Sequence, residues 1–202
     1  EVVNLFSSLK KSDHSLSGLI NAAGVQAPIG EFIGNNMNDW LNNISINLLG
    51  TANMINGFLN VNVKGNQTRK IINFSGGGST SSRPNFSAYA VSKTAVVRLT
   101  EILAEELSAT NIDVNAVSPG SINTDMLEEI IDAGSLAGAE YEIALKRDND
   151  GGDSVDKIVN LCRFLMSAES DGVSGKLISA IWDDYSNVKF LERLKKDVII
   201  PN

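Results

Sequence analysis

Cysteine and histidine are nearly absent from the sequence, which has one of each. A single cysteine, Cys162, excludes a disulfide within the chain. It lies in an apolar pattern of helical spacing, so we interpret it as a thiol in the core rather than a nucleophile. The only histidine, His14, lies in a polar run typical of a surface turn. Most metal sites and catalytic triads that need histidine are therefore excluded, and we expect no metal site.

Long apolar runs and an excess of positive charge are also lacking. No apolar run approaches the roughly 18 residues of a membrane span, and no signal peptide is visible, so we expect a cytoplasmic protein. The net charge of -7 argues against nucleic acid or an anionic membrane as a partner. A chain of 202 residues with 43% hydrophobic side chains fits one domain, 1–202, that buries a substantial core.

The apolar segments are of two kinds. Short, continuously apolar runs predict buried strands at Leu16–Asn21, Lys70–Phe74, Ile112–Val117 and Lys176–Trp182. Helical spacing predicts helices at Glu1–Lys11, Asp39–Asn60, Asn85–Ser108, from a Ser154 N-cap to Ser167, and Tyr185–Lys196. Glycines break 125–152 into short helical pieces. Apolar strands separated by helices indicate a parallel sheet covered on both faces, which is a doubly wound, Rossmann-like α/β fold.

The most specific chemical pattern is a tyrosine and a lysine four residues apart, Tyr89 and Lys93, within the best predicted helix. Residues at this spacing lie one turn apart on the same helical face. An ammonium beside a phenol favours the phenolate, so we expect the pKa of Tyr89 to fall from about 10 toward the working range of an acid–base catalyst. Such a pair suits proton transfer to or from a carbonyl oxygen while a hydride moves on carbon.

Several motifs together resemble the short-chain dehydrogenase/reductase family, in its single-domain Tyr-x-x-x-Lys branch. They match in order and spacing over nearly the whole chain, and the first departs from the family's Asn-Asn-Ala-Gly only by alanine in second place. The matching segments are Asn21-Ala22-Ala23-Gly24, Trp40 with Asn47 seven residues later, Ile71-Ile72-Asn73-Phe74-Ser75, Tyr89 with Lys93, and Pro119-Gly120-Ser121-Ile122-Asn123-Thr124.

The resemblance implies hydride transfer between NAD or NADP and a small-molecule alcohol or carbonyl substrate. Tyr89 would be the general acid/base, and Lys93 would lower its pKa and bind the nicotinamide ribose hydroxyls. Asn47 would hold, through its main chain, a water that links Lys93 to solvent.

The resemblance also implies which residues bind the cofactor. Ile122 and Thr124, in the segment that begins Pro119-Gly120, would hold the nicotinamide carboxamide, and Asn21, Ala22 and Gly24 would lie along the adenosine half. In this family the helices that carry the asparagine and the tyrosine commonly pair across a two-fold axis. We therefore expect a homodimer or homotetramer.

One departure concerns the family serine that hydrogen-bonds the substrate oxygen, about thirteen residues before the tyrosine. Counting back from Tyr89 leads to Gly76. Ser75 reaches in through a shifted turn, or another hydroxyl of the loop substitutes, or Tyr89 and backbone N–H groups polarise the oxygen alone. Ser75 is our candidate catalytic serine. Because loss of one such donor typically costs a few kcal/mol of transition-state stabilisation, the residue at this position bears directly on the reaction rate.

A second departure is the lack of a Gly-rich turn, with which the family begins and on which it holds the cofactor pyrophosphate. The chain begins in what should be the helix before the fourth strand. The preceding segment is then disordered, removed by proteolysis, or truly absent, and the last would leave the strand at Leu16–Asn21 as a flat apolar edge. We expect weak or no dinucleotide binding by this chain, and the choice between NAD and NADP stays open.

Two peripheral segments complete the expectations. The stretch 125–153 lies where the family has its substrate lid, and 185–202 is expected to be a tail helix whose leucines dock on the body or on a partner. A rival hypothesis comes from Gly76 and the lack of a Gly-rich turn: a non-catalytic Rossmann-fold module for binding or assembly.

Overall fold

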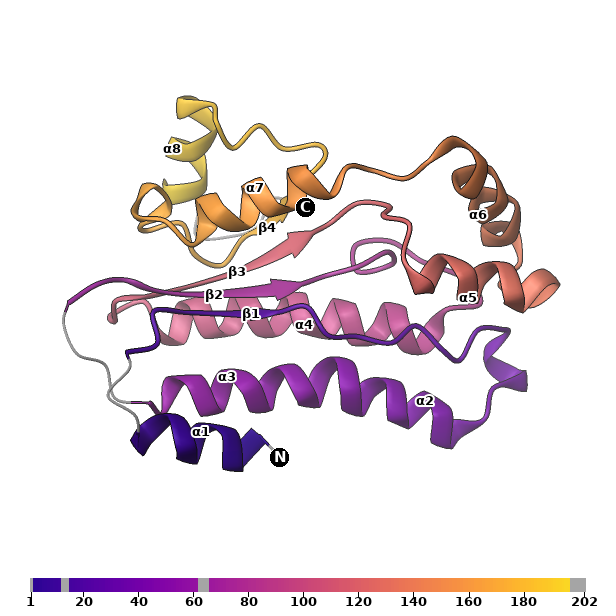
Figure 1. Ribbon diagram of the computed structural model, residues 1–202, viewed down its shortest axis with the longest axis horizontal. Coiled ribbons are helices and arrows are strands. Elements are labelled where there is room, and N and C mark those ends of the chain that lie inside the picture. The colour runs from indigo at the N-terminus through magenta and orange to yellow at the C-terminus, as the bar shows by residue number, and fades with distance from the viewer. Residues whose placement is uncertain (1, 12–14, 62–65, 197–202) are drawn as a thin grey trace.

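Four parallel strands form the centre of the computed structural model, which describes residues 2–11, 15–61 and 66–196. The spatial order is β1-β2-β3-β4, with β1 at Gly18–Asn21, β2 at Arg69–Phe74, β3 at Ile112–Ser118 and β4 at Leu177–Ser179. The register pairs Leu19 with Ile71 and Ile71 with Val114. The predicted parallel α/β sheet is confirmed (Figure 1).

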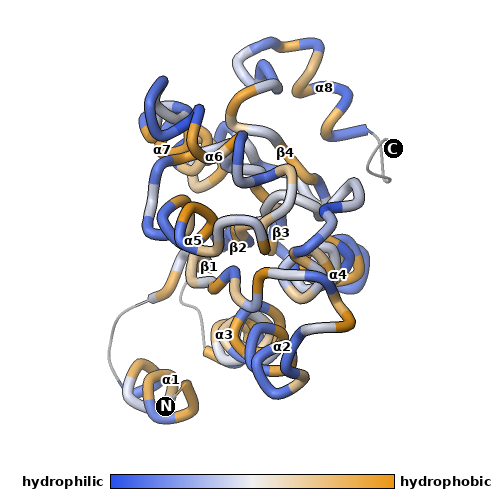
Figure 2. The backbone as a smooth tube through the Cα atoms, turned by 90° about the vertical axis from the view of Figure 1, so that its right-hand side faces the viewer, coloured by the Kyte–Doolittle hydropathy of each residue, from blue (hydrophilic) through white to orange (hydrophobic). Residues whose placement is uncertain are grey.

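Helices cover both faces of this sheet. On one face lie α1 (Val2–Lys11), α2 (Met37–Ile44), α3 (Thr51–Leu59) and α4 (Ser87–Glu106). On the other lies α7 (Val155–Leu165), which the end-on view in Figure 2 shows opposite α3 and α4, and α8 (Val188–Lys196) packs leucines against the same core cluster. Two further helices, α5 (Asp125–Ala133) and α6 (Ala139–Asp150), lie beyond the carboxyl ends of the strands (Figure 1).

The core is divided into two apolar clusters by the sheet itself. Consecutive strand residues point to opposite faces, so Ile71 packs with Phe58 of α3, whereas Ile72 packs with Leu161 of α7. Both isoleucines are almost completely buried. A strand whose two faces are both covered reads as a continuous apolar run, which is why the sequence predicts it so clearly.

Most helices and strands form within a few residues of their predicted bounds. The predicted N-cap is confirmed, because the Ser154 side chain accepts a hydrogen bond from the Asp156 N–H. The last strand is shorter than predicted and ends at Ser179 instead of Trp182. Its Ser179 hydroxyl accepts from the N–H groups of Ile181 and Trp182, and these bonds form a turn.

Two predicted helical regions differ in detail. The helix predicted at Asp39–Asn60 contains a π-helical segment, Ser45–Gly50, between α2 and α3. The stretch 125–152 is more regular than the short helical pieces that the sequence predicts. It contains α5 and α6, which are joined by a 3-10 turn at Gly134–Ala137, and Gly138 has φ +59°.

Parts of two predictions fall outside the described residues: His14, and 197–202 of the tail helix. Within the described residues, α8 accounts for the rest of that helix, and its Leu191 and Leu194 pack against the cluster around α7. No helix in this described part of the chain is long and apolar enough to cross a membrane.

Candidate active site

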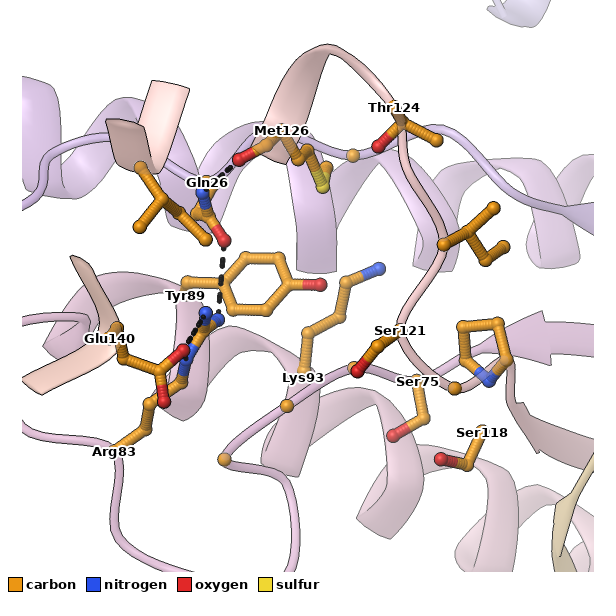
Figure 3. A pocket seen from close by; sticks show the side chains of 18 of the residues that line it. Gln26, Ser75, Arg83, Tyr89, Lys93, Ser118, Ser121, Thr124, Met126 and Glu140 are labelled. Atoms are coloured by element: carbon orange, nitrogen blue, oxygen red, sulfur yellow. Dashed lines mark hydrogen bonds and ion pairs between the residues drawn. The ribbon is translucent and has the colours of Figure 1, made fainter. Parts of the chain in front are cut away.

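A cavity of about 1020 Å³ opens at the carboxyl ends of the strands. The loops that follow β1, β2 and β3 line it, together with one face of α4 and residues of α5 and α6. In parallel α/β sheets, ligands bind at this end of the strands. Figure 3 shows the side chains that point into the cavity.

Tyr89 and Lys93 both line the cavity from successive turns of α4 (Figure 3). Lys93 Nζ lies 5.9 Å from the centroid of the Tyr89 ring and donates a hydrogen bond to the main-chain oxygen of Phe74, at 3.0 Å. Lys93 is only 4% exposed. On the same helix, Ala88 and Val96 are almost completely buried. The predicted pair is therefore brought together in one cavity.

The expected fall in the pKa of Tyr89 is wrong for this structure. Burial of the phenol raises its pKa, and the positive charge that opposes this rise belongs to Arg83. Burial also lowers the pKa of Lys93 to about 8, because the ammonium has lost much of its water. The Phe74 carbonyl that Lys93 binds is neutral. For Tyr89, the loss of hydration outweighs the opposing charge of Arg83.

Ser75 forms part of the cavity wall, but it is only 2% exposed, and its hydroxyl donates to the Ser79 hydroxyl at 2.8 Å. The next residue, Gly76, lies directly against the tyrosine: a Cβ there would overlap the Tyr89 hydroxyl. The Tyr89 ring thus fills space that a side chain at 76 would need. The role of Ser75 as the catalytic serine stays a prediction.

Asn47 is fully buried and does not line the cavity. Its Oδ1 accepts from the Val25 N–H at 2.8 Å, and its Nδ2 contacts Val25 O, Asn43 Oδ1 and Ser92 Oγ at 2.9 Å each. Its main-chain oxygen accepts from the Thr51 hydroxyl. The side chain therefore ties the loop after β1 to α4, and the predicted water-holding role of its main chain stays a prediction.

The residues predicted along the adenosine half of the cofactor divide into two groups. Ala22 and Gly24 line the cavity. A Cβ at Gly24 would lie 3.3 Å from Lys93 Nζ, so the glycine permits the close approach of the lysine. Asn21 instead donates to Asn73 Oδ1 across the sheet, and Asn73 donates in turn to the Thr100 hydroxyl. Asn21 is not among the cavity residues.

The loop after β3 brings all of its predicted residues to the cavity wall: Pro119, Gly120, Ile122 and Thr124. Gly120 has φ +82°, and a Cβ there would overlap Ile181. The loop is fixed by a reciprocal pair, in which the Ser121 N–H donates to the Asp153 carboxylate and the Asp153 N–H donates to Ser121 O.

Sequence reasoning missed a charged cluster beside Tyr89. The Arg83 guanidinium stacks on the Phe86 ring at 3.9 Å and donates to Glu140 Oε2 at 2.8 and 3.2 Å. It also donates to Gln26 Oε1 at 3.2 Å, and Gln26 donates to Met126 O (Figure 3). One signal could have found part of it: Glu140, Ile143 and Arg147 lie on one face of α6 at helical spacing, and all three line the cavity.

Comparison with known proteins gives independent evidence of the family to which the chain belongs. A family model described as "Enoyl-(Acyl carrier protein) reductase" matches residues 1–180. Oxidoreductase UcpA of Salmonella typhimurium is 35% identical over 121 residues, which are 60% of this chain and 46% of that protein. The 3-oxoacyl-[acyl-carrier-protein] reductase FabG of Thermotoga maritima is 33% identical over 141 residues, 69% of this chain and 54% of that protein. The chain thus spans about half the length of these curated relatives.

Among solved structures, a gluconate 5-dehydrogenase from Burkholderia cenocepacia, in complex with NADP and tartrate, superimposes with a TM-score of 0.75. It is 26% identical, and the match covers 88% of this chain and 68% of the other.

Proposed function

Because the chain belongs to the short-chain dehydrogenase/reductase family, we propose that it performs the chemistry of an NAD- or NADP-dependent oxidoreductase that acts on an alcohol or carbonyl substrate. The observation that carries the proposal is the presence of Tyr89 and Lys93 on successive turns of α4, in one cavity at the carboxyl ends of the strands.

Tyr89 acts as the general acid in carbonyl reduction. Its hydroxyl donates a proton to the substrate oxygen while a hydride adds to the carbonyl carbon. The raised pKa of Tyr89 keeps the phenol protonated at neutral pH, which suits this direction. In alcohol oxidation the phenolate takes the proton back, and Arg83 is the charged neighbour that favours this form.

The cavity residues fit the nicotinamide half of a dinucleotide. Lys93 is a buried ammonium that donates a hydrogen bond to the neutral Phe74 carbonyl, so it can also bind ribose hydroxyls. Gly24 leaves space beside it, and the loop that contains Ile122 and Thr124 forms the facing wall. When bound, such a cofactor supplies or accepts the hydride. Tyr89, Lys93 and this loop orient the reacting groups around it.

The helices α5 and α6 form the substrate side of the cavity. Met126, Ile130 and Ile143 give this wall an apolar part, while Gln26, Arg83 and Glu140 give it a polar part. We infer that the stretch 125–153 acts as the substrate lid, in keeping with the glycines that connect its helices.

The outer faces of α2, α4 and the π segment support self-association. Leu41, Leu49 and Val91 are each at least half exposed there, so these elements carry apolar side chains that a second copy could cover. We infer a homodimer or homotetramer in which these helices pair.

The test is turnover by the purified protein, with a panel of carbonyl compounds and either NADH or NADPH. Tyr89→Phe removes the proton donor and should lower kcat/KM at least 100-fold, the usual contribution of general acid catalysis. The matched control is Tyr185→Phe, which alters a tyrosine stacked on Phe164, outside the cavity. Full turnover by Tyr89→Phe would contradict the proposal and favour a non-catalytic module.

A further inference from the structure

The proposed function gives no role to Arg147, a charged residue of the cavity. Arg147, on α6, lines the same cavity as Tyr89, and its Nε is buried without a hydrogen-bond partner in the part of the chain that the structure describes. A buried N–H without a partner costs free energy unless a ligand or a water satisfies it. Arg147 follows Glu140 and Ile143 along the face of α6 that borders the cavity.

The charges around Arg147 favour an additional anion. Burial lowers the pKa of Arg147, and repulsion from Arg83 lowers it further. Glu140 and Asp153 oppose this, but both carboxylates are already engaged, with Arg83 and with the Ser121 N–H. Arg83 and Arg147 could therefore bind more carboxylates than remain free beside them.

The other acids of the cavity do not supply the missing partner. Asp125 and Glu129 also line it, but within the described residues neither forms an ion pair with Arg147. Burial and the charge of Asp125 raise the pKa of Glu129, so that carboxyl holds a proton more readily than usual. The guanidinium of Arg147 therefore remains available to bind an anionic ligand.

The geometry points to a carboxylate in particular. Glu140 already demonstrates that a carboxylate fits against a guanidinium on this wall, at 2.8 Å from Arg83 Nη2. A guanidinium Nε and a neighbouring Nη form a planar fork that matches the two oxygens of a carboxylate. Figure 3 shows Arg83, Gln26 and Glu140 on the side of Tyr89 away from Ser118.

We propose that the substrate carries a carboxylate, and that the guanidinium of Arg147 binds it beside the Arg83–Glu140 ion pair. Arg147 is then a specificity-determining residue: it favours a keto or hydroxy acid over its neutral ester. This inference rests on the proposed function, because only an enzyme has a substrate. The anion site itself can be tested without turnover.

The test follows arginine Nε–Hε resonances by NMR while the protein is titrated with 4-oxopentanoate. Its methyl ester is the neutral control, at matched ionic strength. The Arg147 resonance is identified by its loss in Arg147→Gln. We expect it to shift saturably with the acid and not with the ester.

Affinity is then measured on the side-chain amide of Gln26. Arg147→Gln should weaken acid binding about tenfold, as expected for loss of a charge-assisted hydrogen bond. Arg163→Gln, which removes an exposed arginine of α7, should leave it unchanged. Equal responses to acid and ester, or unchanged affinity in Arg147→Gln, would overturn the proposal.

A third titration separates a substrate carboxylate from a cofactor phosphate. If inorganic pyrophosphate shifts the Arg147 resonance and the carboxylate does not, the proposal is overturned and the site belongs to a phosphate. None of these measurements needs a cofactor or a reaction. A protein that fails here but loses activity in Tyr89→Phe therefore contradicts the substrate class alone.

Discussion

Gly76 determines how closely the Tyr89 ring can lie against the loop after β2, because any Cβ at this position would overlap the tyrosine hydroxyl. Gly76→Ser, which introduces the serine of the family pattern, should therefore displace Tyr89. We expect kcat to fall about 100-fold, since misplacing a reacting group by about 1 Å can have that effect. Steady-state kinetics of the purified variant measure it.

The neighbouring glycine provides the control for that experiment. A Cβ at Gly77 would lie 3.5 Å from the Arg83 guanidinium, an ordinary contact, so Gly77→Ser should retain most activity. Higher turnover in Gly76→Ser than in the wild type would show instead that Tyr89 moves aside easily and that the chain benefits from the added hydroxyl.

Lys93 should make the stability of the protein depend on pH in an unusual direction. Burial lowers its pKa from 10.5 to about 8, so below pH 8 the folded state carries a buried ammonium at full cost. Between about pH 8 and 10.5 the folded state has released this proton while the unfolded chain still holds it. The free energy of unfolding should therefore rise with pH in this window, by about 3 kcal/mol at most.

The measurement is chemical denaturation of the wild type and of Lys93→Met from pH 7 to 10.5. The difference in unfolding free energy between the two proteins should move in favour of the wild type as the pH rises. Lys157→Met, which alters an exposed lysine of α7, should follow the wild type throughout. Parallel curves for wild type and Lys93→Met would contradict the prediction.

The sequence identifies some residues of the site and misses others for a physical reason. Tyr89 and Lys93 lie on one helix, so their spacing alone predicts that they meet. Gln26, Arg83 and Glu140 come from three separate elements and are brought together only by the tertiary fold. The direction of the Tyr89 pKa shift was also beyond spacing, because it depends on how much water burial removes.

At the scale of elements, the π segment between α2 and α3 is notable because it contains Asn47. Such segments are frequent at functional sites. The Asn47 amide holds both the N–H and the carbonyl of Val25, and Asn47→Ala would leave the part-buried N–H without this partner, while the carbonyl keeps its bond from Asn43 Nδ2. We expect a loss of about 2–4 kcal/mol in unfolding free energy, measured by denaturant titration.

A neighbouring asparagine supplies the comparison. Asn42 lies on α2 but is exposed, so Asn42→Ala should change stability by less than about 0.5 kcal/mol. Similar losses in the two variants would mean that the Val25 contacts contribute little.

Element type was predictable where one face or both faces of a segment are buried, as in β2 and α4. The π segment was not, because a six-residue change in hydrogen bonding leaves the spacing of apolar residues almost intact. The end of β4 was also missed: Ala180 and Ile181 are apolar and continue the strand pattern, but the Ser179 hydroxyl and the Asp183 carboxylate bind nearby N–H groups and form a turn.

At the scale of the whole molecule, an exposed apolar residue on the outer face of α4 predicts that the protein self-associates in solution. Val91 is 50% exposed and lies on the surface that we infer to pair with a second copy. Val91→Glu would place a charge in that interface and should weaken self-association at least tenfold. Light scattering after size exclusion measures the mass of each species.

Val188→Glu is the matched control, since Val188 is 69% exposed but lies on α8. It should leave the oligomer intact. A monomeric wild type, or dissociation by Val188→Glu alone, would contradict the inferred pairing.

A buried polar network that joins α2, the π segment and α4 has a consequence for how the sequence of this protein can change over generations. Asn43, Asn47 and Ser92 share their donors and acceptors in one closed network. Replacing any one of them removes a hydrogen bond from each of the other two, so a stepwise change of all three passes through destabilised single variants. The three positions should therefore be inherited as a unit. A library that randomises them jointly should return folded combinations that no series of single-site libraries reaches.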